Sequence, residues 1–176
     1  TGVMIIASKQ GDFELREWEL TDCFSLAEHI NNIKIWNNVR DGLPHPYTLQ
    51  DAEAYIRMVQ TKPFVQDFAI VVDGKAVGGV GIVPMSDVGR VSAEIGYWLG
   101  EAYWGRGIMS EAVRLVADYT FRETEILRLF AHVYEYNFAS MKVLEKAGFT
   151  KLTILRKAAI KNGKVIDAYY YDLVKD

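Results

Sequence analysis

The order of hydrophobic and polar residues along the chain predicts a sheet with helices packed on it. Residues 13–18 alternate between apolar and polar side chains, as a strand with one buried face does. Residues 68–72 and 76–83 are apolar runs joined by Asp73-Gly74, which predicts a β-hairpin. Further strands are expected over residues 91–99, 128–134, 151–160 and 165–174. We therefore expect about seven strands.

Helices are predicted where apolar residues recur every three or four positions. Thr21-Asp22 has the side chains of a helix cap ahead of residues 23–30, and a second helix is expected over residues 48–60. The longest apolar stripe predicts a helix over residues 108–124. A short helix over residues 138–147 ends at Gly148, a natural left-handed cap, and the glycine- and proline-containing stretch 37–47 is expected to be a loop.

A strand, a helix and a second strand follow one another in the middle of the chain. The strands at 91–99 and 128–134, with the helix between them, have the spacing of a parallel crossover. Ligands of such sheets bind beyond the carboxyl ends of the strands, which is where residues 104–110 fall. The fold class predicted is therefore α/β, with a mixed sheet and helices on both faces.

Composition narrows the class of protein. The 176 residues fit one domain over residues 1–176, with 50% hydrophobic and 24% charged residues, as in an ordinary globular protein. A net charge of −3 argues against a nucleic-acid coat or an anionic-membrane binder. Neither a spanning helix nor a signal peptide is expected, and the single cysteine, Cys23, favours a reducing cytoplasm. Residues 1–3, ahead of Met4, are interpreted as a cloning remnant.

A turn with two glycines is the candidate ligand site. Gly105 and Gly107 directly precede the helix expected at residue 108, so bare backbone N–H groups and a partly positive helix N-terminus lie together. This arrangement predicts a phosphate cradle, although the same glycines alone also suit a simple tight turn. A Walker loop is absent, and a dinucleotide fingerprint fails at Ser110, where a third glycine is required.

Four blocks of sequence around that turn carry a family resemblance. They are residues 94–99, 103–112, 137–140 and 144–149, and the likeness extends to residues 38–47, Asp167 and Tyr170. They resemble the GNAT superfamily of acyl-CoA-dependent N-acetyltransferases and look most like its RimJ/RimL-type branch of ribosomal-protein N-terminal acetyltransferases. Trp104 and Met109 depart from the common pattern, which puts side-chain rather than backbone contacts in question. The implied sheet is twisted and mostly antiparallel.

The resemblance implies acetyl-CoA as the acyl donor and assigns residues to it. The backbone of Tyr97, Trp98 and Leu99 would pair with the pantetheine arm as an added strand does. Amides of the cradle would hold the pyrophosphate; its residues are Gly105, Arg106, Gly107, Ile108, Met109 and Ser110. The Arg106 side chain either adds a charge-assisted contact or stays solvated. Asn137 would hydrogen-bond the pantetheine, or else it caps the short helix.

The implied chemistry is direct attack of a primary amine on the thioester in a ternary complex. A backbone N–H on the strand at residues 91–99 would stabilise the oxyanion. Ser140 would sit near the sulfur and help to protonate the leaving thiolate, or else it is a cap residue. Glu94 is the candidate base, acting through a water, or else a surface residue. His132, between two apolar neighbours, is interpreted as structural, and His45 as a residue that shapes the acceptor pocket.

The acceptor is left open between a protein N-terminus and a small primary amine. By the resemblance, residues 36–47 and the turn around residues 162–163 line its entrance. A protein α-amine is partly neutral at pH 7, whereas a lysine costs about 3 kcal/mol more to deprotonate. The alternative is an acyl-CoA-binding sensor or interaction module without turnover. The histidines and the cysteine lack metal-ligand spacing, so no metal is expected, and the final strand or the splayed central edge is a candidate for pairing in a homodimer.

Overall fold

An eight-stranded sheet forms the frame of the molecule, in the order β1-β2-β3-β4-β5-β6-β8-β7. The computed structural model describes residues 4–176, so the remnant expected at residues 1–3 lies outside the described residues. The strands are β1 (Ile5–Ala7), β2 (Glu14–Glu17), β3 (Asp67–Val72), β4 (Lys75–Pro84), β5 (Ser92–Leu99), β6 (Arg128–Tyr134), β7 (Thr150–Lys161) and β8 (Lys164–Val174). Each neighbouring pair is antiparallel except β5 and β6, which are parallel. The expected mixed, mostly antiparallel sheet is confirmed, with eight strands rather than seven.

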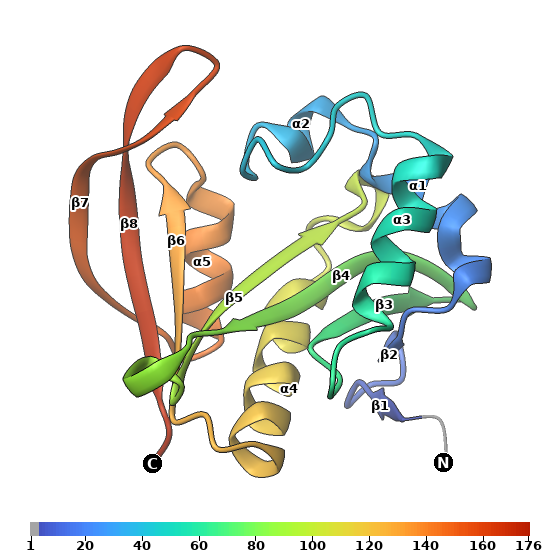
Figure 1. Ribbon diagram of the computed structural model, residues 1–176, viewed down its shortest axis with the longest axis horizontal. Helices are drawn as coiled ribbons and strands as arrows, with labels where there is room; N and C mark the ends of the chain where they lie inside the picture. The colour runs from blue at the N-terminus through green and yellow to red at the C-terminus, as the bar shows by residue number, and fades with distance from the viewer. Residues whose placement is uncertain (1–3) are drawn as a thin grey trace.

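Helices cover both faces of the sheet, as expected. They are α1 (Cys23–Ile30), α2 (Ile33–Trp36), α3 (Leu49–Val59), α4 (Ile108–Glu123) and α5 (Phe138–Lys146), with short 3₁₀ turns η1 (Leu20–Asp22), η2 (Asp87–Gly89) and η3 (Glu101–Tyr103). Helices α1 and α3 lie on one face, and α4 and α5 on the other (Figure 1). Within the described residues, no helix is both long and apolar enough to cross a membrane.

The alternation of side chains along β3 separates two cores. Phe68 and Ile70 are buried in the larger core beneath α4, whereas Ala69 and Val71 are buried against α1 and α3. Because successive side chains of a strand point to opposite faces, one apolar strand serves both layers. The sheet is therefore anchored between helices at β3 and β4, which fixes the position of β5 next to them.

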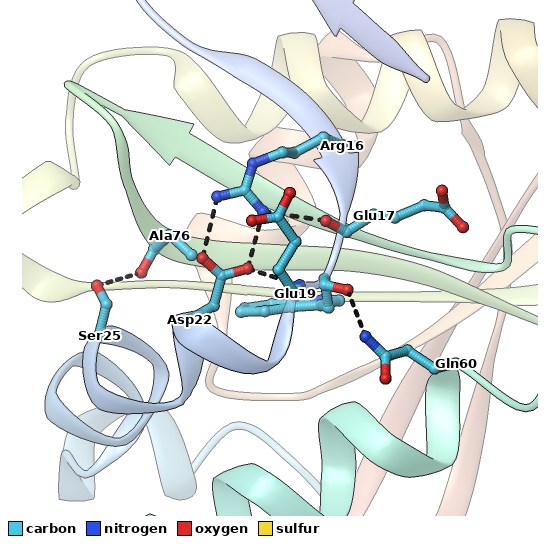
Figure 2. A network of polar contacts seen from close by, with 8 residues as sticks. Arg16, Glu17, Glu19, Asp22, Ser25, Gln60 and Ala76 are labelled. Atoms are coloured by element: carbon cyan, nitrogen blue, oxygen red, sulfur yellow. Dashed lines mark hydrogen bonds and ion pairs between the residues drawn. The ribbon is translucent and has the colours of Figure 1, made fainter. Parts of the chain in front are cut away.

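The cap expected ahead of α1 has a different role in the structure. Asp22 makes no capping hydrogen bond to α1. Its carboxylate instead accepts from both terminal nitrogens of Arg16, at 2.8 and 3.0 Å, and from the backbone N–H of Glu19 (Figure 2). The prediction of a cap at Thr21-Asp22 was wrong because a buried guanidinium competes for the same carboxylate. The pair ties β2 to the start of the helical layer.

The parallel crossover from β5 through α4 to β6 is confirmed, and its pairing is short. Only three pairs join the two strands, the last being Glu94 with Phe130. Beyond it β5 continues against β4 to Leu99, and β6 continues against β8 to Tyr134. The two strands diverge from one another in this stretch (Figure 1). The sheet is thus split between β5 and β6, and the split opens toward the turn that precedes α4.

Candidate active site

The glycine turn presents free backbone donors at the start of α4. Gly105 and Gly107 have φ of 76° and 74°, in the left-handed region that glycine adopts without strain. A Cβ placed on either glycine would meet no atom within 4 Å, so both open sides face away from the protein. Within residues 4–176, no backbone N–H from Gly105 to Ser110 donates a hydrogen bond to the protein. These donors, at the positive end of a 16-residue helix, suit a phosphate group.

Two side chains connect this turn to the residues that precede it, one to the end of β5 and one to η3. The indole N–H of Trp104 donates to the carbonyl of Leu99 at 2.7 Å. The Arg106 guanidinium donates to the carbonyl of Ala102 at 3.2 Å and lies 5.2 Å from the centre of the Tyr103 ring. Trp104 therefore holds the turn in place next to the end of β5. Any pantetheine contact at Leu99 would share its carbonyl with that indole.

The residues expected to pair with pantetheine lie along the open side of β5. Tyr97, Trp98 and Leu99 all come after the last pair that β5 makes with β6. They pair with β4 on their other side. Since backbone groups of a strand point alternately to its two edges, this stretch offers unpaired groups toward the split. The open edge leads through η3 directly into the glycine turn.

Ser140 and Asn137 belong to the first turn of α5, but their contacts differ. The Asn137 side chain accepts from the backbone N–H of Ser140 at 3.3 Å, so Asn137 caps the helix as the alternative interpretation held. The hydroxyl of Ser140 lies 2.6 Å from that of Tyr97. Burial raises the pKa of the Tyr97 phenol, while the hydrogen bond with Ser140 acts in the opposite direction. The phenol therefore keeps its proton at neutral pH.

Glu94 and His132 meet across the last paired residues of β5 and β6. The Glu94 carboxylate lies 2.6 Å from Nδ1 of His132, and both side chains are more than a third exposed. The imidazole stacks on Tyr170 of β8, with 5.0 Å between ring centres. His132, interpreted from the sequence as structural, has its side chain on the open face of the sheet, where it contacts Glu94. The alternation along β6 indicates which face His132 lies on. Leu129, Ala131 and Val133 are buried on one face, and His132 lies between them on the other.

The two segments expected at the acceptor entrance contact each other. Lys161, at the end of β7, donates to the carbonyl of Val39 at 2.7 Å and to the carboxylate of Asp41 at 2.8 Å. Its ammonium lies 3.3 Å from the centre of the Trp36 ring, and the residue is only 4% exposed. A buried lysine therefore fastens the hairpin of β7 and β8 to the loop that follows α2.

Two further contacts continue this connection. Asn162 donates to the side-chain oxygen of Asn37 at 3.1 Å, and the hydroxyl of Tyr136 donates to the Asn37 carbonyl. His45 of the same loop packs against Trp36, with 5.8 Å between ring centres. The loop and the hairpin thus form one continuous wall beside the split.

A family model described as an acetyltransferase (GNAT) domain matches residues 12–150. The chain belongs to the GNAT acetyltransferase family. The probable N-acetyltransferase YjcK of Bacillus subtilis (strain 168) is 46% identical over 91 residues. These residues are 52% of this chain and 50% of that protein, so the match spans half the length of YjcK. The N-acetyltransferase p20 of Bacillus licheniformis, whose function is uncharacterised, is 31% identical over 167 residues, 92% of each chain.

A solved structure shares the fold over its whole length. The ribosomal L7/L12 α-N-protein acetyltransferase RimL, in complex with coenzyme A, superposes with a TM-score of 0.85 at 22% identity, covering 98% of this chain and 99% of that one. The family and fold implied by the sequence resemblance are confirmed. GNAT enzymes use acetyl-CoA as the acyl donor, and the free amides at the start of α4 fit its pyrophosphate.

Two hollows on the surface lie away from the glycine turn and from the open edge of β5. One, of about 210 Å³, lies between β2 and the end of α3, and one of about 440 Å³ lies beside the end of α4. The open edge of β5 is a gap between two strands of the sheet, beyond the last pair that β5 makes with β6. In residues 4–176, no cluster of three or more His, Cys, Asp or Glu is placed to hold a metal ion.

Proposed function

We propose that this chain transfers the acetyl group of acetyl-CoA to a primary amine by direct attack in a ternary complex. The observation that carries the proposal is the run of unpartnered backbone N–H groups from Gly105 to Ser110, which continues from the open edge of β5. A ligand with a pyrophosphate at one end and an amide-containing arm at the other matches this order of donors. Membership of the GNAT family supports the same co-substrate.

The proposed co-substrate contacts are mostly made by the backbone. Tyr97, Trp98 and Leu99 pair with the pantetheine arm along β5, and the side-chain amide of Asn137 donates to it from the start of α5. The pyrophosphate lies on the N–H groups of the cradle, contributed by Gly105, Arg106, Gly107, Ile108, Met109 and Ser110. Arg106 lies at the edge of this cradle, where its charge favours the diphosphate. These contacts are made by backbone N–H groups and do not depend on the side chains. The departures from the family pattern at Trp104 and Met109 therefore leave them intact.

The pair of hydroxyls at the split protonates the leaving group. The amine lone pair attacks the thioester carbonyl, a C–N bond forms, and the C–S bond breaks to release a thiolate. Ser140 passes its proton to that sulfur and takes one from the Tyr97 phenol, and the phenolate so formed regains a proton from solvent. Because burial raises the pKa of Tyr97, the phenol is protonated again before the next turnover. A backbone N–H of β5 stabilises the developing oxyanion.

The amine must lose a proton before it attacks. Glu94 lies on the open face of the sheet at the point where β5 and β6 separate, and its carboxylate receives this proton through a water. A carboxylate is a weak base, which suits an α-amine near pKa 8 better than a lysine near 10.4. The RimL structure is named for acetylating a protein α-amine. A protein N-terminus is therefore the first acceptor to test, with small primary amines second.

Two accompanying properties are proposed on separate grounds. The only cysteine, Cys23, is buried and free, which suits the reducing conditions of the cytoplasm. The final strand of the chain, β8, was expected at an edge but lies between β6 and β7, so it is not free to pair. The edge strand is β7, which exposes Leu152 and Ile154 by 51% and 40%. A second copy pairing along β7 would cover them, and analytical ultracentrifugation of the wild type and of Leu152→Lys tests whether a dimer depends on this edge.

Calorimetric titration with acetyl-CoA, CoA and ATP tests the proposed function first. We expect micromolar binding of acetyl-CoA and CoA and no heat from ATP. Thiol-release assays against N-terminal peptides and small amines then identify the acceptor class. Binding without release from any amine would favour a sensor that holds acyl-CoA without turnover. Absence of acetyl-CoA binding would overturn the proposal.

A further inference from the structure

The Glu94–His132 pair stands at the point where the sheet divides. Glu94 is the last residue of β5 that pairs with β6, and its partner is Phe130. His132 lies two residues further along β6 than Phe130. Their side chains share the face of the sheet opposite α4 and α5, where β6 and β8 are left uncovered by helices (Figure 1). An amine approaching the split from this face meets the pair directly.

The contacts of the imidazole define the state in which it is held. The Glu94 carboxylate accepts a hydrogen bond from Nδ1, at 2.6 Å, so the neutral ring carries its proton on Nδ1. Tyr170 stacks on one side of the ring, and Phe130 approaches edge-on, with 5.9 Å between centres. Within residues 4–176, Nε2 has no hydrogen-bond partner. The lone pair of Nε2 is therefore free to accept a proton, and the side chain is 37% exposed to the solvent from which an acceptor arrives.

We propose that His132 is the general base that takes the proton from the acceptor amine, and that Glu94 is the residue that positions it. This inference rests on the proposed function, and it replaces the water between amine and Glu94 by an imidazole. The N–H bond of the incoming ammonium breaks as an Nε2–H bond forms, and the freed lone pair attacks the thioester. Glu94 then faces an imidazolium and stabilises its charge. The imidazolium later releases the proton to water.

The groups around the ring are consistent with this role. Imidazoles in general change charge between pH 5 and 8, which is the range in which a base must be neutral to act. The ionisable neighbours are Glu94 on β5, Tyr170 on β8 and Tyr134 two residues along β6. Arg128 lies further back on β6 and binds the Tyr170 hydroxyl at 3.1 Å and the Asp172 carboxylate at 3.3 Å. The Arg128 guanidinium is therefore paired with these two groups and not with the imidazole.

The same contact also has a purely structural interpretation, in which the pair only joins β5 to β6. His132→Asn separates the two, because the asparagine amide nitrogen takes the position of Nδ1 and still donates to Glu94 but cannot take up a proton. If His132 is the base, this variant loses about 100-fold or more in kcat, the usual contribution of a general base. Its dissociation constant for acetyl-CoA, measured by calorimetry, should stay within about threefold of the wild type.

Chemical rescue and a spectroscopic readout complete the experiment. Imidazole added to His132→Ala should restore a concentration-dependent part of the lost rate, because only the proton acceptor is missing. Imidazole ¹H–¹⁵N correlation spectra of the wild type should show the Nδ1–H tautomer at pH 8, and those of Glu94→Gln a mixture. Glu125→Gln, an exposed glutamate outside the site, is the matched control.

The outcomes distinguish this inference from the proposed function. Wild-type turnover with full kcat in His132→Asn would overturn the role of His132 and leave acetyl transfer standing. An Nε2–H tautomer in the wild type would overturn it as well, because that nitrogen could then accept no proton. Absence of wild-type turnover with every amine would overturn both. Loss of kcat in His132→Asn, with rescue of His132→Ala by imidazole, supports the inference.

Discussion

The hydroxyl of Tyr97 lies 2.6 Å from the hydroxyl of Ser140 and joins the open edge of β5 to the first turn of α5. The two residues come from opposite sides of the split sheet and are 43 positions apart in the sequence. The phenol is protonated at neutral pH, because burial raises its pKa. This pair therefore links the two sides of the split by a hydrogen bond between side chains.

Ser140→Ala should lower kcat about 10- to 100-fold and leave the affinity for acetyl-CoA within about threefold. The reason is that the variant removes the link between the phenol and the sulfur but no backbone contact to the co-substrate. Steady-state kinetics with calorimetric affinities measure the two effects. Ser86→Ala, at an exposed loop position, is the control. A lower melting temperature with unchanged kcat would reduce Ser140 to a structural residue.

Gly107→Val should raise the KM for acetyl-CoA about 100-fold. Its side chain would project from the open side of Gly107, where no protein atom lies within 4 Å, and would occupy the place expected for the pyrophosphate. The left-handed φ of 74° adds strain of roughly 1–2 kcal/mol. Gly11 has the same φ and equal free space, away from the site, so Gly11→Val carries the strain alone. An equal loss of acetyl-CoA affinity in both variants would count against the cradle.

Lys161→Met should raise the KM for the acceptor amine several-fold and lower the free energy of unfolding by about 1–3 kcal/mol. Methionine keeps the packing against Trp36 but releases the carbonyl of Val39 and the carboxylate of Asp41. Urea unfolding and acceptor kinetics provide the measurements. Lys164→Met, on the exposed side of the same turn, is the matched control. An unchanged acceptor KM would show that the wall formed by this loop does not shape the acceptor site.

The stability of the protein should fall between pH 10 and 12. Burial, together with the nearby Asp51 carboxylate, raises the pKa of Tyr47 to about 12, whereas an unfolded tyrosine titrates near 10. The folded state therefore holds a proton that the unfolded chain releases, and the free energy of unfolding decreases as pH rises through this window, by about 2 kcal/mol from this residue. Tyr47→Phe should lose less stability over the same range in denaturant titrations. Parallel curves for the two proteins would contradict this origin.

The sequence was most informative where the pattern is local. The hairpin turn at Asp73-Gly74, the crossover through α4 and the left-handed cap at Gly148 were each predicted, because the residues that determine them are adjacent in the chain. Strand β1 has three residues and α2 a single turn, which are too short for any period to emerge. Their positions follow from pairing with β2 and from packing on Tyr47 and its neighbours.

Contacts between distant segments leave no local pattern in the sequence. Asp22 was expected to cap a helix, and no local signal indicates that Arg16 lies opposite it. The partnership of Tyr97 with Ser140 likewise depends on how α5 packs against β5. His132 is the exception, because the alternation along β6 already places it opposite the buried residues. Reading that alternation, rather than the apolar character of its immediate neighbours, would have found it.

The short pairing between β5 and β6 has a consequence for the folded lifetime of the protein. A co-substrate that fills the split would act as a missing strand and bind only the folded chain. At a concentration one hundred times its dissociation constant, such a ligand adds about 2.7 kcal/mol to the free energy of unfolding. The abundance of the folded protein would then follow the acetyl-CoA supply, so that a starved cell would hold less of this enzyme as well as less of its acyl donor.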